Sequence, residues 1–157
     1  MRKEYITWDQ YFMGVAKLSA MRSKDPATQV GACIINQDKR IVGIGYNGMP
    51  QGCDDTLFPW GKDGRFDETK YPYVVHAEAN AILNATQNLK GSTIYVTLFP
   101  CHECTKLIIQ SGISEIVYES DKYRDGLEHQ AALKMLRAAQ ISHRKIEVGE
   151  LAYVKLD

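Results

Sequence analysis

The sequence predicts an α/β fold in which helices cover both faces of one sheet. Helical and strand-like patterns alternate along the chain in the order αββαβαβα, and the links between helices and strands are short. The chain has 157 residues, enough for one domain with a substantial core. We therefore expect a single domain over residues 1–157.

The first part of the chain predicts a helix followed by two strands. Thr7 and Gln10 have the spacing of a capping box, and apolar residues recur behind them at helical spacing. The Asp25-Pro26 pair disfavours further helix. Strand-like runs follow at 30–35 and 41–46, joined by a polar turn. The apolar residues of the helix are Trp8, Tyr11, Phe12, Val15 and Leu18.

Residues 47–73 are rich in Gly, Pro, Asp and aromatic residues and show little periodicity. A segment of this length without regular structure is usually functional when it occurs in a compact domain. We therefore expect this segment to have a function.

The second part of the chain predicts alternating helices and strands. The helices are expected at 76–88, 100–111 and 127–139. Strands are expected at 93–98 and 113–118, with weaker candidates at 145–148 and 152–156. Pro100 suits the first turn of the second of these helices, and Gly112 suits its end.

Charge and hydropathy limit the possible partners. Nineteen basic residues balance nineteen acidic ones, which argues against broad binding to a nucleic acid polymer. No apolar run approaches the roughly 18 residues of a membrane span, and the N-terminus lacks the apolar core of a signal peptide. We expect a cytoplasmic protein with no membrane partner. In that setting paired cysteines bind metal more often than they form disulfides.

His76, Cys101 and Cys104 have the spacing of metal ligands. The two cysteines stand at a helix start, where positions i and i+3 share a face and the helix dipole favours thiolate. Together with His76-Ala77-Glu78 they match H-x-E followed by P-C-x-x-C, the known signature of zinc deaminases. One imidazole and two thiolates leave a fourth position on zinc for water, and zinc lowers the pKa of that water towards neutrality.

Glu78 is the expected proton shuttle because it stands two residues from a ligand. It would take a proton from the water, deliver it to N3 of cytosine and protonate the departing amine. Alternatives remain: a closed structural zinc site with a solvated Glu78, a redox pair at Cys101 and Cys104, or chance co-occurrence. The redox pair leaves the H-x-E motif unexplained.

A series of further motifs extends from the first helix to about Tyr123. They are SKDP (23–26), QVGA (29–32), GIGYNGMP (43–50), YPYV (71–74), HAE (76–78), FPC (99–101) and SDKY (120–123). On these motifs the chain resembles the deoxycytidylate (dCMP) deaminases of the cytidine and deoxycytidylate deaminase superfamily.

The resemblance implies a fold, a reaction and its regulation. The implied fold is a cytidine-deaminase-like three-layer αβα sandwich with a five-stranded mixed sheet flanked by helices. The implied reaction is hydrolysis of dCMP to dUMP and ammonia at a catalytic zinc ion, which feeds thymidylate (dTTP) synthesis. The implied assembly is a homohexamer activated by dCTP and inhibited by dTTP, with Mg²⁺ accompanying the bound triphosphate.

The resemblance also implies substrate contacts. Asn47 would hydrogen-bond the deoxyribose hydroxyl, although Asn-Gly is also a common turn former. Arg22 and Lys24 would bind the substrate phosphate, or form an ordinary solvated charge cluster. Tyr123 and Arg124 would close over the substrate. The other implied substrate contacts are Ala77, Leu98 and Phe99, of which the last two would serve equally well as core residues.

The implied effector loop covers residues 48–55. Its expected contacts are Gly48, Met49, Pro50, Gly52, Asp54 and Asp55. Cys33 is expected in the core, and Cys53 has no obvious partners for a second metal site. His102 should point away from the metal, because position i+1 does not share the face of i and i+3. The remaining histidines, His129 and His143, are expected at the surface.

Three rival functions share part of this pattern. Free cytidine deaminases typically use cysteine at the position of His76. A tRNA adenosine deaminase would have the same H-x-E motif but usually adds a basic surface. A zinc module that only senses dCTP or dTTP would have no need of Glu78.

Overall fold

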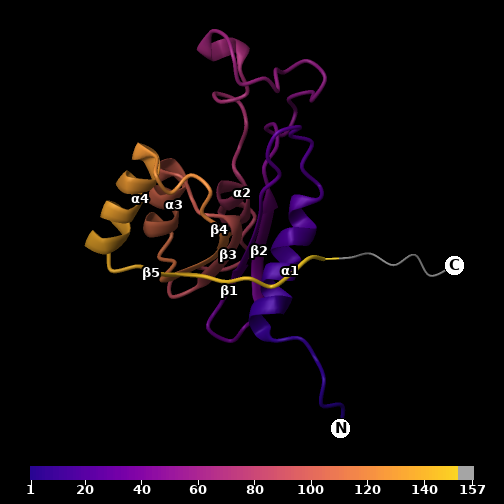
Figure 1. The fold of residues 1–157 in the computed structure, drawn as a ribbon, viewed down its shortest axis with the longest axis vertical. Coiled ribbons are helices and arrows are strands. Elements are labelled where there is room, and N and C mark those ends of the chain that lie inside the picture. The colour runs from indigo at the N-terminus through magenta and orange to yellow at the C-terminus, as the bar shows by residue number, and fades with distance from the viewer. Residues whose placement is uncertain (152–157) are drawn as a thin grey trace, which may run out of the picture.

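A five-stranded mixed sheet forms the centre of the molecule, as predicted (Figure 1). This computed structural model describes residues 1–151. The strand order is β2-β1-β3-β4-β5, with β1 antiparallel to β2 and β3, and with β3, β4 and β5 parallel. The strands are β1 (Gly31–Ile35), β2 (Ile41–Tyr46), β3 (Thr93–Leu98), β4 (Glu115–Ser120) and β5 (Ser142–Lys145).

Helices cover both faces of the sheet, which gives the predicted αβα sandwich (Figure 1). The helix α1 packs on one face, and α2, α3 and α4 lie on the other. Their bounds are α1 (Trp8–Ala20), α2 (Ala77–Leu83), α3 (His102–Gln110) and α4 (Leu127–Ala138).

The central strands are buried on both faces. In β3 Ile94 and Val96 belong to the core beneath α2, α3 and α4, whereas Tyr95 belongs to the core beneath α1. This division follows from the alternation of side chains along a strand. Cys33 of β1 lies in the α1 core with no exposed surface, as predicted.

The capping box of α1 is present. The Thr7 hydroxyl accepts the Gln10 N–H at 3.2 Å, and the Gln10 side chain accepts the Thr7 N–H at 2.8 Å. Of the five apolar residues that marked this helix in the sequence, only Phe12 is fully buried. Besides Phe12 the helix buries Met13 and Ala16, and its backbone lies so close to β1 that a Cβ atom on Gly31 would meet the Ala16 carbonyl oxygen.

Two predicted helix boundaries were wrong. The helix α2 ends at Leu83 rather than at residue 88. Beyond its end, the Thr86 N–H bonds to the carbonyl of Val42 in β2 at 2.9 Å, so tertiary hydrogen bonds take the chain out of the helix. The helix α3 begins at His102 with Cys101 as its cap, so Pro100 precedes the cap instead of occupying the first turn.

The last strands also differ from the prediction. Residues 113–118 were expected as a strand, but β4 begins and ends two residues later. The last described strand covers Ser142–Lys145, three residues earlier than the expected strand at 145–148, and Ile146 and Val148 pack against the α1 core. The candidate strand at 152–156 lies outside the described residues.

The segment from 47 to 73 is irregular, as predicted, apart from a short 3-10 helix at Phe66–Glu68. It extends away from one end of the sheet (Figure 1). It then returns to its starting point, where Gly48 and Val75 form an isolated antiparallel bridge. Within residues 1–151, no helix combines the length and the apolar character needed to cross a bilayer.

Candidate metal centre and active site

Two helix starts bring the three predicted ligands together. His76 is the N-cap residue of α2, and Cys101 is the N-cap residue of α3. The Nδ1 atom of His76 lies 3.4 Å from the Sγ atoms of both Cys101 and Cys104. All three ligand atoms lie within 4.8 Å of one another. Residues 25 positions apart in the chain therefore form one compact donor group.

This donor group fits zinc. Nitrogen and sulfur ligands at tetrahedral angles on zinc are about 3.5 Å apart, close to the two observed distances. The hydrogen bond with Cys104 lowers the pKa of Cys101 to about 4; burial opposes this shift, and the hydrogen bond with His76 adds to it. Hydrogen bonding to Cys101 raises the pKa of Cys104 and raises that of His76 to about 9. These directions favour loss of the proton from Cys101 first, and a metal would displace the remaining protons because ligands bind deprotonated.

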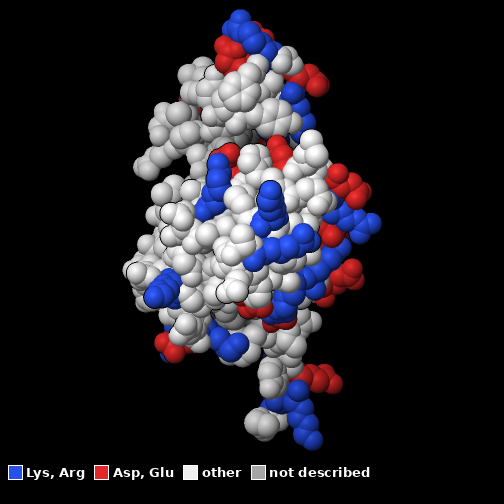
Figure 2. Space-filling model, turned by 90° about the vertical axis from the view of Figure 1, so that its left-hand side faces the viewer, with Lys and Arg blue, Asp and Glu red and all other residues white. Residues whose placement is uncertain are grey.

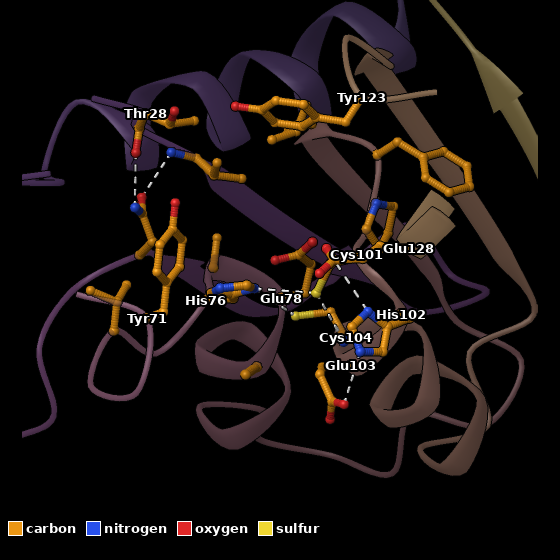
Figure 3. A pocket seen from close by; sticks show the side chains of 18 of the residues that line it. Thr28, Tyr71, His76, Glu78, Cys101, His102, Glu103, Cys104, Tyr123 and Glu128 are labelled. Atoms are coloured by element: carbon orange, nitrogen blue, oxygen red, sulfur yellow. Dashed lines mark hydrogen bonds and ion pairs between the residues drawn. The ribbon is translucent and has the colours of Figure 1, made fainter. Parts of the chain in front are cut away.

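Glu78 lies in the same space as the donor group (Figure 3). It stands in the first turn of α2 and is only 4 % exposed. Burial raises the pKa of its carboxyl group, and this effect exceeds the opposing effect of nearby His76. A carboxyl group with a raised pKa can hold and pass on a proton near neutral pH.

A cavity of about 1280 Å³ opens over the donor group and Glu78. Its wall is formed by three stretches of the chain, within 25–47, 62–79 and 98–129. Tyr71 and Tyr123 lie on one side of the cavity, and His102 and Glu103 lie on the opposite side (Figure 3). The cavity is large enough for a nucleotide, and most of its exposed wall is apolar.

The structure brings five of the eight predicted substrate contacts to this cavity. They are Asn47, Ala77, Leu98, Phe99 and Tyr123. Asn47 is 6 % exposed, and its amide accepts the Val30 N–H at 2.8 Å and donates to the Thr28 carbonyl at 2.9 Å. Arg124, Arg22 and Lys24 are not among the residues that line it.

Arg22 and Lys24 lie instead at a second hollow of about 230 Å³. Lys24 pairs there with Asp55, and the Arg22 guanidinium lies 5.9 Å from the centre of the Tyr46 ring. The hollow contains five of the six predicted effector contacts, namely Gly48, Met49, Pro50, Gly52 and Asp55. The sixth, Asp54, instead accepts hydrogen bonds from Thr56. Asn47 lines both the hollow and the cavity.

The other histidines do not join the donor group. His102 Nε2 lies 3.1 Å from the Glu103 carboxylate, in agreement with the expectation that it points away. His143 is exposed, as expected. His129 was expected at the surface but is half-buried, because its ring lies against Phe99 with centroids 4.3 Å apart.

Among the charged residues of the cavity wall that sequence reasoning missed, two are buried. Asp25 and Lys70 are 2 % and 7 % exposed and form an ion pair with each other. Asp25 lies within the SKDP motif and Lys70 directly precedes the YPYV motif, but each is an ordinary surface residue type. The signal that reveals them is their burial, which only the fold provides.

The surface around α4 carries charges of both signs. Lys and Arg side chains lie there among uncharged and acidic side chains (Figure 2). This distribution agrees with the balanced charge of the whole sequence.

Comparison with known families places this geometry in context. Residues 6–120 match the family described as the cytidine and deoxycytidylate deaminase zinc-binding region. The deoxycytidylate deaminase of Mus musculus is 56% identical over 147 residues, which cover 92% of this chain and 82% of the mouse protein. The probable deoxycytidylate deaminase of Drosophila melanogaster is 55% identical over 151 residues, which cover 92% of this chain and 74% of the fly protein.

Solved structures share the fold. The dCMP deaminase of the cyanophage S-TIM5, in complex with dCMP and dUMP, superposes with a TM-score of 0.71 at 24% identity. The match covers 93% of this chain and 99% of the phage chain. At this level of identity the likeness establishes the αβα architecture.

Proposed function

The chain belongs to the cytidine and deoxycytidylate deaminase family, and from this premise we propose that it hydrolyses dCMP to dUMP and ammonia. One observation carries the proposal: the His76, Cys101 and Cys104 side chains converge beside the buried carboxyl group of Glu78. The choice of dCMP is supported by the names of the curated relatives, which are more than half identical to this chain.

His76, Cys101 and Cys104 would hold one zinc ion. Bound there, zinc would act as a Lewis acid and lower the pKa of water, so that hydroxide is available as the nucleophile near neutral pH. Because both helix starts are fixed by the fold, the three side chains need little rearrangement to bind.

Glu78 would move the protons of the reaction. Its carboxylate takes a proton from the attacking water and passes it to N3 of the cytosine ring. The carboxylate then takes the second proton of the former water and delivers it to the exocyclic amine, so that the C4–N bond breaks, ammonia leaves and the oxygen stays on C4 as a carbonyl. The raised pKa of Glu78 favours the protonated form that each delivery step needs.

The remaining cavity residues would orient the nucleotide. Ala77, Leu98 and Phe99 would contact the base, and the fixed amide of Asn47 would meet the deoxyribose hydroxyl. The exposed Tyr123 would close over the substrate. The proposed contact to the phosphate is Lys62, which lines the cavity itself, because Arg22 and Lys24 lie at the second hollow and Arg124 lines neither.

The second hollow would bind the effectors dCTP and dTTP together with Mg²⁺. It contains two cations, and through Asn47 it shares a wall with the cavity. We further propose that the chain is one deaminase domain that acts as a cytoplasmic homohexamer and supplies dUMP for dTTP synthesis.

The first experiment compares deamination of dCMP, cytidine and a tRNA anticodon loop by the purified zinc-loaded protein. We expect turnover of dCMP, with little or none of the other two. Turnover of only the RNA would overturn the proposed substrate. Nucleotide binding without any turnover would instead indicate a sensing module.

A second experiment measures initial rates against dCMP concentration with and without dCTP or dTTP. Sigmoidal curves that dCTP straightens and dTTP depresses are expected. Hyperbolic curves that respond to neither nucleotide would contradict the proposed regulation.

A further inference from the structure

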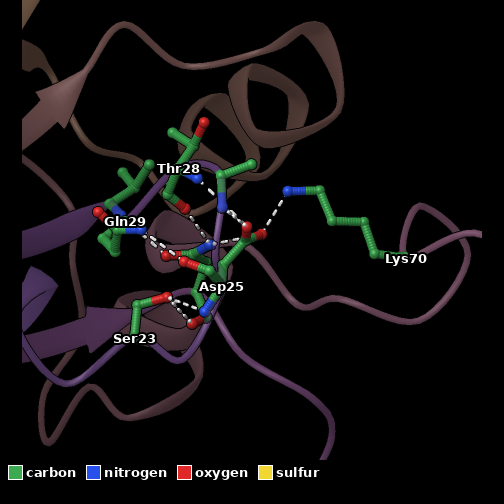
Figure 4. Close-up of polar contacts among 8 residues, drawn as sticks. Ser23, Asp25, Thr28, Gln29 and Lys70 are labelled. Atoms are coloured by element: carbon green, nitrogen blue, oxygen red, sulfur yellow. Dashed lines mark hydrogen bonds and ion pairs between the residues drawn. The ribbon is translucent and has the colours of Figure 1, made fainter. Parts of the chain in front are cut away.

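A buried ion pair joins two walls of the cavity. The ammonium group of Lys70 pairs with the Asp25 carboxylate, 45 residues away in the chain (Figure 4). Both side chains line the cavity that holds His76 and Glu78. Removing one partner of such a pair leaves an uncompensated buried charge, so the two residues depend on each other.

Asp25 organises the wall on its own side. Its Oδ1 atom accepts the N–H groups of Ala27 at 2.8 Å and Thr28 at 3.2 Å. Its Oδ2 atom accepts from Lys70 and, at 3.5 Å, from the amide of Asn47. Although burial raises the pKa of Asp25, the hydrogen bonds from Lys70 and the backbone hold it below its usual value.

Lys70 organises the opposite wall through its backbone. Its N–H donates to the Gly61 carbonyl at 2.9 Å, and its carbonyl accepts the N–H groups of Tyr73 and Val74, both at 3.0 Å. This turn leads directly to His76. The side chain of Lys70 therefore ties the segment that precedes a proposed zinc ligand to the wall that orients Asn47.

We propose that Lys70 is a positioning residue for nucleotide binding. Its ammonium group holds the turn at 70–74 against Asp25, and Asp25 in turn holds the Thr28 turn and the amide of Asn47 in place. Lys70 thereby fixes the sugar-binding end of the cavity, whereas Glu78 and the donor group stand on α2 and α3. The identity of the nucleotide, dCMP, rests on the proposed function.

The test compares Lys70→Met, which keeps the length of the side chain, with Lys70→Arg, which keeps the charge. For Lys70→Met we expect KM for dCMP to rise by about tenfold or more, because the contacts to substrate are misplaced. Zinc content should stay unchanged, and kcat should change by no more than about threefold, since the groups that react are untouched. Lys70→Arg should recover most of the wild-type KM.

A double variant separates the positioning role from the effect of leaving the Asp25 charge buried without a partner. Asp25→Asn combined with Lys70→Met removes both charges. If Lys70→Met alone does not fold, this double variant replaces it in the test. We expect the double variant to bind zinc as the wild-type protein does, and its KM for dCMP to remain higher than that of the wild-type protein. A wild-type KM in the double variant would overturn the proposal, as would a fall in kcat without a change in KM. Lys90→Met, at an exposed site outside the cavity, is the matched control and should keep the wild-type KM.

Hydrogen–deuterium exchange gives a readout that does not depend on turnover. In Lys70→Met, amides in residues 25–30 and 70–76 should exchange faster, while those of β3 keep their protection. If the wild-type protein does not deaminate dCMP, the proposed function fails but the exchange comparison still tests Lys70. Unchanged exchange in both segments would overturn the positioning role.

Discussion

Glu78 combines burial with a place next to three potential metal ligands. Its carboxyl group has almost no contact with solvent, and burial raises its pKa. The neighbouring cysteines have opposite shifts, because Cys104 donates a hydrogen bond to the Cys101 thiolate. At the scale of single residues, the site thus contains a carboxyl group suited to proton transfer, that of Glu78, and a thiol group suited to metal binding, that of Cys101.

Substitution of Glu78 by Gln tests the first of these roles. The amide has nearly the same shape but cannot carry a proton between water and base, so kcat for dCMP should fall by about 10²–10⁴-fold. Zinc content, measured by elemental analysis, should not change. Glu4→Gln, at the exposed N-terminus, is the matched control. Near-normal turnover in Glu78→Gln would remove this residue from the mechanism.

Single residues differ in how far the sequence predicts their place. The convergence of His76, Cys101 and Cys104 was predictable, because the two motifs together match the known signature of zinc deaminases and each stands at a predicted helix start. The pairing of Asp25 with Lys70 was not, because neither local pattern nor spacing links positions 45 residues apart. Arg22 and Lys24 were predicted beside the substrate, but they line the second hollow.

At the scale of elements, α2 lies unusually close to β2. A Cβ atom built on Gly45 would lie 2.4 Å from the Ala77 carbonyl oxygen and 2.4 Å from the Ala81 nitrogen. One built on Gly43 would lie 2.4 Å from the Ala81 carbonyl oxygen. The absence of side chains at these two positions lets the helix rest on the strand. The height of α2 over the sheet in turn sets the positions of His76 and Glu78.

Gly45→Ala should therefore disturb the metal centre from a distance. We expect α2 to shift, with a loss of about 1–3 kcal/mol of unfolding free energy from overpacking. The zinc content of the purified protein should fall as well. Urea unfolding and metal analysis measure the two effects. Gly14→Ala in α1 is the control, because its Cβ would meet nothing within 4 Å. Wild-type stability and zinc content in Gly45→Ala would contradict this account.

Helices and strands were predictable where the local pattern of apolar and polar residues alone determines their bounds. The strand β3 has the predicted bounds, because its β-branched run is buried on both faces. The end of α2 was not predictable, since Thr86 and Asn84 bond to the backbone of β2 rather than continuing the helix. The early position of β5 was not predictable either, since its four residues are polar and exposed, and the apolar Ile146 and Val148 pack against the α1 core just after it.

At the scale of the whole molecule, one charged cluster links α1 to three strands. Arg144 of β5 donates to both carboxylate oxygens of Asp9, at 2.7 and 2.8 Å, and to Glu115 of β4 at 3.0 Å. The Tyr95 hydroxyl of β3 donates to Asp9 at 2.7 Å. The hydrogen bond from Arg144 is the main reason that the pKa of Asp9 lies below its usual value.

This cluster should make stability depend on acid pH. The folded protein lowers the pKa of Asp9 below its ordinary value of 3.8. The contribution of Asp9 to the free energy of unfolding is therefore complete above pH 3.8, and it is lost as the pH falls through the pKa of the folded state. The urea concentration at the midpoint of unfolding should therefore decrease for the wild-type protein when the pH falls below about 4. Asp9→Asn should be less stable at neutral pH and should show a smaller drop.

The control for this prediction is Asp38→Asn, in the exposed turn between β1 and β2. It should follow the wild-type curve. An equal drop in Asp9→Asn and in the wild-type protein would mean that other carboxylates cause the acid sensitivity.

The cavity has walls from three separate stretches of the chain, so any molecule that fills it is held by all three at once. A bound nucleotide favours the folded state in proportion to its concentration, and it suppresses the partial openings through which proteases cut. We therefore expect survival in the cell to be longer when substrate is plentiful. The abundance of this protein would then follow the supply of the molecule on which it acts.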